Sequence, residues 1–238
     1  MSQRSLDGGA EPWPFPNPLW PDPPWEMEGN VLTAWFHADP ALLARLAHED
    51  FPPNPDGQQT RLRFYDIEGQ ADGQTIRFRE AVVAYKTEFE GVTGELSALM
   101  WTDSLPYLAW GREIFGWPLR FAEIHLTSGF WEGDHSNPAA CHIEYLSLTS
   151  VRIETELVKE ASESSTWITP HRSVPATDPG VEERRVYAVK PRTIGVGRSY
   201  VCSGVLDVGP LLGDVVDAEF DFVSGVRIEV GADVQSIQ

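Results

Sequence analysis

The sequence predicts an α+β protein made mainly of antiparallel β-strands, which form a closed or nearly closed β-barrel with a few helices. Three observations support this fold class. Most segments alternate apolar and polar residues, which is the period of half-buried strands, and few carry a helical pattern. The 238 residues are 42% hydrophobic and 11% aromatic, which suffices for one large core. Many strands with few helices favour a barrel over a layered α/β fold.

Residues 1–25 are expected to form an arm rich in proline and tryptophan, and residues 26–238 a single domain. The arm includes the runs Pro12-Trp13-Pro14-Phe15-Pro16 and Pro23-Pro24-Trp25. Proline at this density excludes helices and central strands, so an extended, polyproline-like conformation is expected. The aromatic residues favour an arm that lies on its own domain or on a neighbouring subunit, and a flexible tail is the alternative.

Two helices and a series of strands are expected in the domain. Asp39 is the predicted N-cap of the first helix, with Pro40 at its first position and an apolar stripe at Leu42, Leu43 and Leu46. The second helix, capped by Asp103 or Ser104, carries Leu105, Leu108 and Trp110. The expected strands are 30–37, 61–68, 75–89, 94–102, 120–127, 140–156, 184–189, 193–206 and 216–230. The polar stretch 160–183 is typical of a long excursion and not of a domain boundary.

The composition excludes several classes of partner. Acidic residues outnumber basic ones 36 to 18, which gives a net charge of −18 and argues against nucleic acid and anionic membrane surfaces. No signal peptide or membrane-spanning run is visible, so a cytoplasmic location is the default expectation. The histidines lack metal-binding spacings, and we expect neither a metal nor another cofactor. Cys141 and Cys202 are expected to be buried thiols, and a disulfide between them is the alternative.

Glu80 is the first candidate for chemistry. It lies in the middle of an apolar strand face that is shared by Ile76, Phe78, Val82 and Ala84. Desolvation disfavours a charged carboxylate, so such a residue raises its pKa or finds a partner, and it becomes a candidate general acid or base. The alternatives are a structural pairing with an arginine, or a shift of the strand register.

The second candidate is the segment Gly111-Arg112-Glu113-Ile114-Phe115-Gly116-Trp117-Pro118. It is typical of a helix end, because glycine permits a left-handed cap and proline prevents the helix from continuing. We expect this corner to deliver the next residues, Leu119 and Arg120, to a fixed place.

Together with Phe78-Arg79-Glu80-Ala81, this segment resembles the acetoacetate decarboxylase superfamily over residues 60–127. The resemblance implies a cone-shaped antiparallel barrel, usually in a homo-oligomer, whose interior pocket binds small keto acids or their relatives. In the family the string continues with Pro-Lys-Lys or Pro-Lys-Arg, and the first lysine forms a Schiff base with the substrate. Leu119 occupies that position here, and Arg120 keeps the neighbouring cation. An arginine for the substrate carboxylate is expected near Gly29-Asn30, and this sequence has none there.

A leucine cannot form the iminium that the family uses for decarboxylation. The first hypothesis is therefore a lyase, cyclase, dehydratase or isomerase in which Glu80 moves a proton and Arg120 holds a carboxylate or enolate oxygen. Phe78, Trp101, Trp117 and Leu119 are the candidate pocket lining. The substrate would be a small keto acid or a polyketide-like molecule, and the bias toward Arg over Lys favours secondary metabolism in a GC-rich bacterium.

Two alternatives remain open. The first is a non-catalytic binding or regulatory protein that keeps the pocket. The second is a decarboxylase whose amine has moved to one of the three lysines, Lys86, Lys159 and Lys190. Lys86 is in phase with Glu80, but six strand residues separate the two by about 20 Å.

Overall fold

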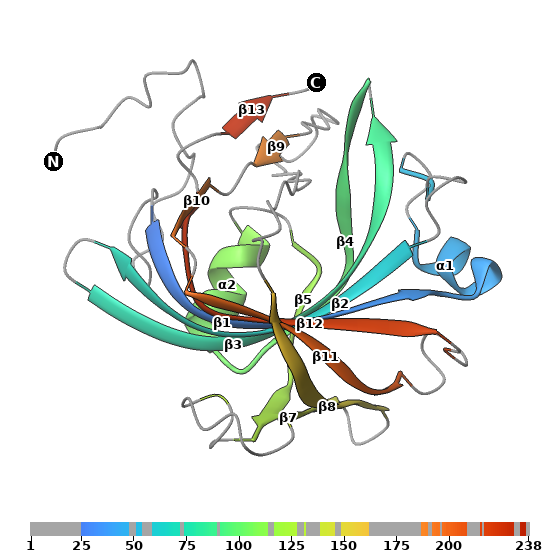
Figure 1. Ribbon diagram of the computed structural model, residues 1–238. Coiled ribbons are helices and arrows are strands. Elements are labelled where there is room, and N and C mark those ends of the chain that lie inside the picture. Colours follow the sequence, from blue (N-terminus) through green and yellow to red (C-terminus); the bar gives the residue numbers. More distant parts are fainter. Residues whose placement is uncertain are drawn as a thin grey trace, which may run out of the picture.

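One eleven-stranded sheet organises the fold in the computed structural model (Figure 1). The structure describes residues 25–47, 51–53, 59–71, 74–89, 91–113, 117–127, 131, 139–145, 149–161, 187–189, 192–195, 197–208, 215, 217–230 and 234–236. The strand order is β5-β4-β3-β2-β1-β12-β11-β8-β7-β6, and β10 pairs with β12. The first five strands are β1 (Trp25–His37), β2 (Gln59–Ala71), β3 (Gln74–Phe89), β4 (Val92–Thr102) and β5 (Leu119–Phe121). The others are β6 (Glu123–Leu126), β7 (Ala139–Tyr145), β8 (Thr149–Ala161), β10 (Arg192–Gly195), β11 (Arg198–Asp207) and β12 (Ala218–Val230). The short strands β9 (Tyr187–Val189) and β13 (Val234–Ser236) pair with each other.

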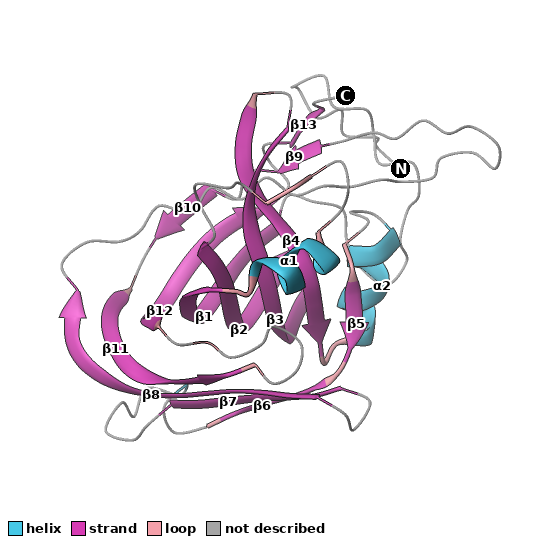
Figure 2. Ribbon diagram, turned by 90° about the vertical axis from the view of Figure 1, so that its right-hand side faces the viewer, coloured by secondary structure: helices cyan, strands magenta, loops and turns pink. Residues whose placement is uncertain are grey.

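The sheet curves so that its two edge strands, β5 and β6, follow one another directly in the sequence. β5 and β6 are separated only by Ala122, whose N–H donates a 3.0 Å hydrogen bond to the carbonyl oxygen of Thr102. Figure 2 shows β6, β7 and β8 as a layer beneath β1, β2 and β3. β5 pairs with β4 in parallel, and every other ladder between described strands is antiparallel. The mainly antiparallel β fold is confirmed, with the parallel β4–β5 pair as an unexpected addition.

The central strands carry different side chains on their two faces. The face toward β6–β8 and β11 holds the larger apolar core, to which Leu32, Phe64, Trp101, Ile143 and Phe222 belong. The opposite face holds a second apolar cluster that includes residues of α2 (Leu105–Glu113). α2 lies on the side of the sheet away from β7 and β8 (Figure 1). The space between the two layers is therefore filled by apolar side chains, and the candidate site lies on the face beneath α2.

The predicted helices are present. α1 (Pro40–Leu46) begins as expected, because Oδ1 of Asp39 accepts hydrogen bonds from the N–H groups of Ala41 at 2.7 Å and Leu42 at 3.4 Å. α2 begins after Ser104, and its first residue, Leu105, is 64% exposed. The helix carries Leu105 and Leu108 as expected, and the buried residue of its first turn is Tyr107 at 3% exposure.

Three predicted strands are interrupted. The stretch 120–127 divides into β5 and β6, 140–156 into β7 and β8, and 193–206 into β10 and β11. At the first break the chain changes its partner strand, because the Ala122 N–H still donates to Thr102 of β4, whereas Glu123 and the rest of β6 pair with β7. Trp25, assigned to the arm, is the first residue of β1 and is 1% exposed, because it packs in the apolar cluster beneath α2. The rest of the arm and residues 162–186 lie outside the described residues.

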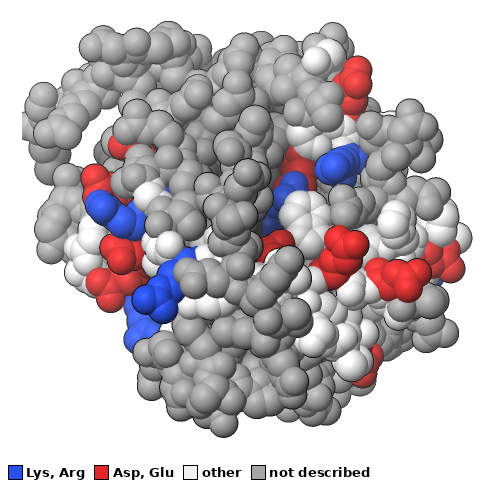
Figure 3. All heavy atoms as spheres, viewed as in Figure 1, with Lys and Arg blue, Asp and Glu red and all other residues white. Residues whose placement is uncertain are grey.

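Charges of both signs are mixed on the visible surface (Figure 3), and both cysteines are buried. Lys, Arg, Asp and Glu side chains intermingle on the face seen in Figure 3, and the described residues there form no large area of one sign. Cys141 and Cys202 are buried free thiols, as predicted. Within the described residues, no helix combines the length and the apolar character needed to span a bilayer.

Candidate active site

Glu80 lies on the face beneath α2, in a row of side chains that crosses four strands. The ladders pair Val31 with Tyr65, Tyr65 with Glu80, and Glu80 with Thr102. Glu80 is 7% exposed, and burial raises its pKa from 4.5 to about 8, although the Tyr107 hydrogen bond and the charge of Arg63 act in the opposite direction. The predicted apolar face of this strand is thus confirmed, and the carboxyl group is protonated at neutral pH.

Tyr107 supplies the direct partner of Glu80. Its hydroxyl donates a hydrogen bond of 3.2 Å to Oε1 of Glu80. Its ring stacks on Phe78 with centroids 3.9 Å apart and lies at 6.1 Å from the Trp117 ring in a tilted arrangement. Burial, and next the negative charge of Glu80, raise the pKa of Tyr107 well above its usual value. The phenol therefore stays protonated and acts as a hydrogen-bond donor.

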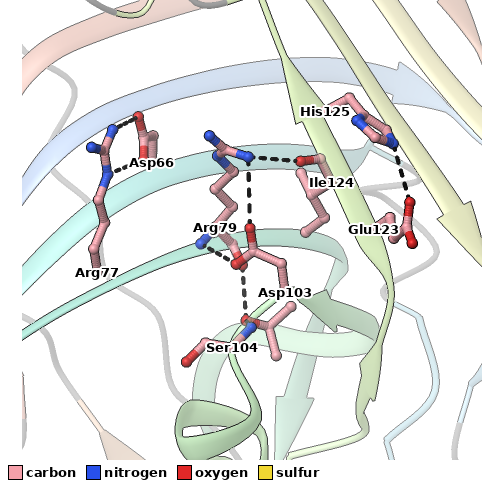
Figure 4. A network of polar contacts seen from close by, with 9 residues as sticks. Asp66, Arg77, Arg79, Asp103, Ser104, Glu123, Ile124 and His125 are labelled. Carbon is pink, nitrogen blue, oxygen red and sulfur yellow. Dashed lines mark hydrogen bonds and ion pairs between the residues drawn. The ribbon is translucent and has the colours of Figure 1, made fainter.

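Thr102 and Asp103 fix the start of α2 to Arg79 of β3, and Ser104 caps the helix (Figure 4). The Thr102 hydroxyl donates to the Arg79 carbonyl oxygen at 2.8 Å. Asp103 accepts a 2.9 Å hydrogen bond from the Arg79 N–H and lies 3.8 Å from its guanidinium group. Ser104 caps the helix, since its Oγ accepts from the Tyr107 N–H at 3.4 Å. These contacts hold Tyr107 over Glu80.

Leu119 lies in the next row of the same face. It pairs with Met100, which pairs with Val82, which in turn pairs with Arg63 of β2. Leu119 is 1% exposed and belongs to the same apolar cluster as Phe78, Tyr107 and Trp117. The helix exit therefore delivers Leu119 to the Glu80 side of the sheet.

Gly111 is needed for this close approach of the helix end to β5. A Cβ atom at this position would lie 2.2 Å from Cδ1 of Leu119 and 3.0 Å from Cε3 of Trp117. The Gly111 carbonyl oxygen also accepts a 2.9 Å hydrogen bond from the Trp117 N–H, which closes the turn. The glycine thus lets Trp117 and Leu119 pack against the end of α2.

Two predicted site residues lie elsewhere. Trp101 belongs to the core between the two layers and is 1% exposed. Arg120 pairs with Trp101, so it is on the face opposite Leu119, and it is exposed. Neighbouring residues of a strand point to opposite faces, so Leu119 and Arg120 cannot both face Glu80. The structure brings Glu80, Phe78, Trp117 and Leu119 together, and it does not bring Arg120 or Trp101 to them.

The cation whose charge acts on Glu80 is Arg63, which the sequence did not single out. Arg63 is 3% exposed and pairs with Glu95 at 3.1 Å, and it donates a long 3.5 Å hydrogen bond to the Tyr65 hydroxyl. Arg61, the next residue on this face, also pairs with Glu95 and stacks over the Trp35 ring at 4.2 Å. In the sequence, Arg61 and Arg63 alternate with the apolar Leu62. This alternation predicts that the arginines face away from the main core, but not that they lie near Glu80.

Gly29 and Asn30 have structural roles. A Cβ on Gly29 would lie 2.0 Å from the Asp66 carbonyl oxygen, so the close approach of β1 to β2 requires glycine. The Asn30 amide donates to the Trp131 carbonyl oxygen at 2.8 Å and accepts from the Gly225 N–H at 3.1 Å. These bonds hold the irregular register between Gly29 and Val31.

A groove of about 600 Å³ lies beside the site, at the start of α2. Phe78 lines it, so the groove adjoins the ring that stacks on Tyr107. Leu105 and Phe121 present exposed apolar surface to it, at 64% and 47% exposure. Arg77 also lines the groove, and it forms an ion pair of 2.9 Å with Asp66 (Figure 4).

The remaining chemical groups lie apart from Glu80. Lys86 is on the Glu80 face, half-buried and opposite Glu95 in the ladder. His125 is on the exposed side of β6, where its ring stacks on His142 with centroids 5.5 Å apart. The described residues contain no group of three or more His, Cys, Asp or Glu side chains that could hold a metal ion.

The family model for acetoacetate decarboxylase matches residues 11–214 of the chain. No curated protein matches it significantly. Among solved structures, it is similar to the enduracididine biosynthesis enzyme MppR complexed with the condensation product of pyruvate and imidazole 4-carboxaldehyde, with 16% identity, a TM-score of 0.74, and 92% and 90% of the two chains covered. It is similar to acetoacetate decarboxylase from Legionella pneumophila, with 16% identity, a TM-score of 0.68, and 100% and 99% covered. An acetoacetate decarboxylase-like enzyme from Sphingomonas wittichii matches with 13% identity, a TM-score of 0.66, and 92% and 95% covered.

Proposed function

Because the chain belongs to the acetoacetate decarboxylase family, we propose that it is an enzyme that carries out acid–base chemistry on a small keto- or carboxylate-bearing substrate without a covalent amine. In this proposal Glu80 is the proton-transfer group. Phe78, Trp117 and Leu119, which lie with it on one face, form the apolar wall against which the substrate packs.

The observation that carries the proposal is the contact between Glu80 and Tyr107. A buried carboxyl group whose pKa lies at about 8 is protonated at neutral pH and can give up its proton when charge develops on the substrate. The 3.2 Å hydrogen bond from Tyr107 fixes Oε1, which leaves Oε2 to exchange a proton with the substrate. Burying a carboxyl group in an apolar face costs free energy of folding, and an apolar side chain at this position would avoid that cost. This cost favours a chemical role for Glu80 over a structural one.

The absence of an amine at position 119 directs the type of reaction. Leu119 is buried beside Trp117, at the place where the family resemblance puts the Schiff-base lysine. Without an iminium, decarboxylation loses its electron sink, whereas proton transfer next to a carbonyl group remains available. We therefore favour a cyclisation, dehydration, isomerisation or related lyase step.

The structural neighbours support a reaction beyond decarboxylation. MppR has this fold and takes part in enduracididine biosynthesis, and its structure holds a condensation product of pyruvate. A role in secondary metabolism, with a keto acid or polyketide-like substrate, is our proposal by analogy with that protein. The homo-oligomeric state and the cytoplasmic location stay predictions.

The test is a screen of keto acids for turnover by the wild-type protein, followed by the Glu80→Gln variant. We expect Glu80→Gln to lose at least about a hundredfold in kcat, the usual contribution of a general acid. Glu88→Gln, which changes an exposed glutamate of the same strand, is the matched control and should keep full activity. A folded Glu80→Gln variant with full activity would refute the proposal. Bound ligand without turnover in the wild type would instead indicate a binding protein.

A further inference from the structure

We propose that Arg63 binds the anionic group of the substrate, the role that the sequence analysis gave to Arg120. This inference deepens the proposed function and rests on it. It makes the substrate a carboxylate whose anionic end lies at β2 while its reacting carbon lies at Glu80.

Arg63 lies one row away from Glu80 on the same face of the sheet. Arg63 pairs with Val82, which is two residues from Glu80 on the same face of β3. Side chains in neighbouring rows of one face are about 6.6 Å apart along a strand. A carboxylate held at the Arg63 guanidinium therefore leaves a carbon two or three bonds away within reach of the Glu80 carboxyl group.

Arg63 is held in place from two sides. Its Nη2 lies 3.1 Å from Oε2 of Glu95, and its Nη1 lies 3.5 Å from the Tyr65 hydroxyl, whose strand position is directly opposite Glu80. Arg63 and Glu95 are each 3% exposed, so solvent screens the guanidinium charge very little. A planar guanidinium fixed in this way suits a carboxylate.

Arg63 lies close to several ionisable groups of this face. It pairs with the carboxylate of Glu95, as Arg61 also does. Burial, and next the charge of Arg63, lower the pKa of Arg61 to about 9, although the charges of Tyr65 and Asp221 oppose this shift. Burial raises the pKa values of Glu80 and Asp221, and the charge of Arg63 opposes both shifts. A substrate carboxylate at Arg63 would reduce the repulsion between the two guanidinium groups while lying close to Glu80.

The row that contains Arg63 also defines the rest of the ligand. Across the sheet it continues through Val82, Met100 and Leu119, which are all apolar and buried. A lysine at position 119 would place a second cation in this row. With leucine at position 119, this row has the cation of Arg63 at β2 and apolar side chains from there to β5. Such a row suits a ligand with one carboxylate group and an otherwise apolar structure.

The experiment compares 4-methyl-2-oxopentanoate with its neutral primary amide by isothermal titration calorimetry. We expect the wild-type protein to bind the acid at least about tenfold more tightly than the amide, because a hydrogen-bonded charge pair is lost with the amide. Arg63→Met should abolish this preference, and Arg63→Lys should retain part of it. Arg120→Met is the matched control and should keep the full preference.

Arg63→Met leaves Glu95 buried without this partner and could unfold the protein. The double variant Arg63→Met/Glu95→Gln, which removes both charges, is therefore measured beside it. If both variants unfold, the comparison is made with Arg63→Lys. The inference is overturned if the wild type does not prefer the acid, if folded Arg63 variants keep the whole preference, or if Arg120→Met removes it. Glu80→Gln separates the two proposals. It should retain the acid preference while turnover is lost. Acid preference in a wild-type protein that turns over none of the keto acids would contradict only the proposed function.

Discussion

Tyr107 and Glu80, which are 27 residues apart, are joined by a hydrogen bond of 3.2 Å from the phenol to Oε1. Tyr107 lies in the first turn of α2, and Glu80 lies opposite the last residue of β4. The position of the acid relative to its donor is therefore set where β4 ends and the helix begins. Asp103 and Ser104 determine that geometry through their bonds to Arg79 and Tyr107.

The first prediction concerns the pH dependence of catalysis. If protonated Glu80 is the active form, kcat/KM should be constant at neutral pH and fall about tenfold per pH unit above the Glu80 pKa, which is about 8. The measurement is a pH profile of kcat/KM from pH 5.5 to 9.5 in buffers of equal ionic strength. A profile that instead rises between pH 6 and 8 would show that Glu80 acts as a base.

The Tyr107→Phe variant should shift this profile in a defined direction. The Tyr107 hydrogen bond lowers the pKa of Glu80, so its removal should raise that pKa and move the alkaline limb to higher pH. We expect a shift of about half a unit to one unit, together with a lower kcat. Since phenylalanine keeps the stacking on Phe78, an unchanged alkaline limb would mean that Tyr107 does not tune Glu80.

The contrast between Glu80 and Arg120 shows what sequence alone could predict. Alternation with Arg77 and Arg79 correctly predicted that Phe78 and Glu80 share a buried face of β3, although from Glu80 to Tyr85 both faces of the strand are buried. Arg120 was misplaced because its orientation depends on a three-residue strand that pairs in parallel with β4. No periodicity exists in so short a segment, and the parallel pairing follows from the return of the chain after α2.

Leu119→Lys tests the family resemblance at this position. A lysine there would be buried next to Trp117 and Met100, where desolvation lowers the pKa of an amine and makes it nucleophilic. When the variant is incubated with a small keto acid and then reduced with borohydride, we expect a covalent adduct that intact-mass spectrometry detects. The wild-type protein should form no such adduct.

Arg120→Lys is the control for this trapping experiment. It places an amine one residue away, on the opposite and exposed face of β5, and should give no adduct beyond the wild-type background. Equal labelling of both variants would show that position 119 has no special access to the ligand. Trapping in the wild-type protein would point to one of its own lysines and would contradict the non-covalent mechanism.

Glu80 should also make stability depend on pH in a specific way. Its folded pKa, about 8, is above the ordinary value of 4.5, so between these pH values the native state holds a proton that the unfolded state releases. The free energy of unfolding should fall with rising pH by up to about 1.4 kcal/mol per pH unit in this window. Urea titrations at pH 5, 6, 7 and 8 should show that Glu80→Gln lacks this slope and that Glu88→Gln keeps it. A difference between wild type and Glu80→Gln that does not change with pH would show that Glu80 is ionised when buried.

Arg61 and Arg63 of β2, the first half-buried and the second buried, show why part of the site could not be predicted. In the run Arg61-Leu62-Arg63-Phe64, alternation places the arginines on the face away from the main core, and such a face is usually solvated. Only the structure shows that this face is itself covered and that Glu95, 32 residues away from Arg63, reaches it. When the second buried face of a strand carries charged residues, the sequence pattern is the same as that of a strand whose second face is exposed to solvent.

Gly111→Ala should destabilise the protein and disturb the site, and the reason lies in two neighbours. The new methyl group would lie 2.2 Å from Cδ1 of Leu119 and 3.0 Å from Cε3 of Trp117, closer than van der Waals contact allows. Overpacking of this kind costs about 1–3 kcal/mol, so a lower melting temperature is expected. Because Leu119 is the nearer neighbour, Leu119→Ala in the same chain should restore part of the loss. A double-mutant cycle by thermal unfolding measures this coupling, and strict additivity of the two substitutions would show that Leu119 does not pack against the end of α2.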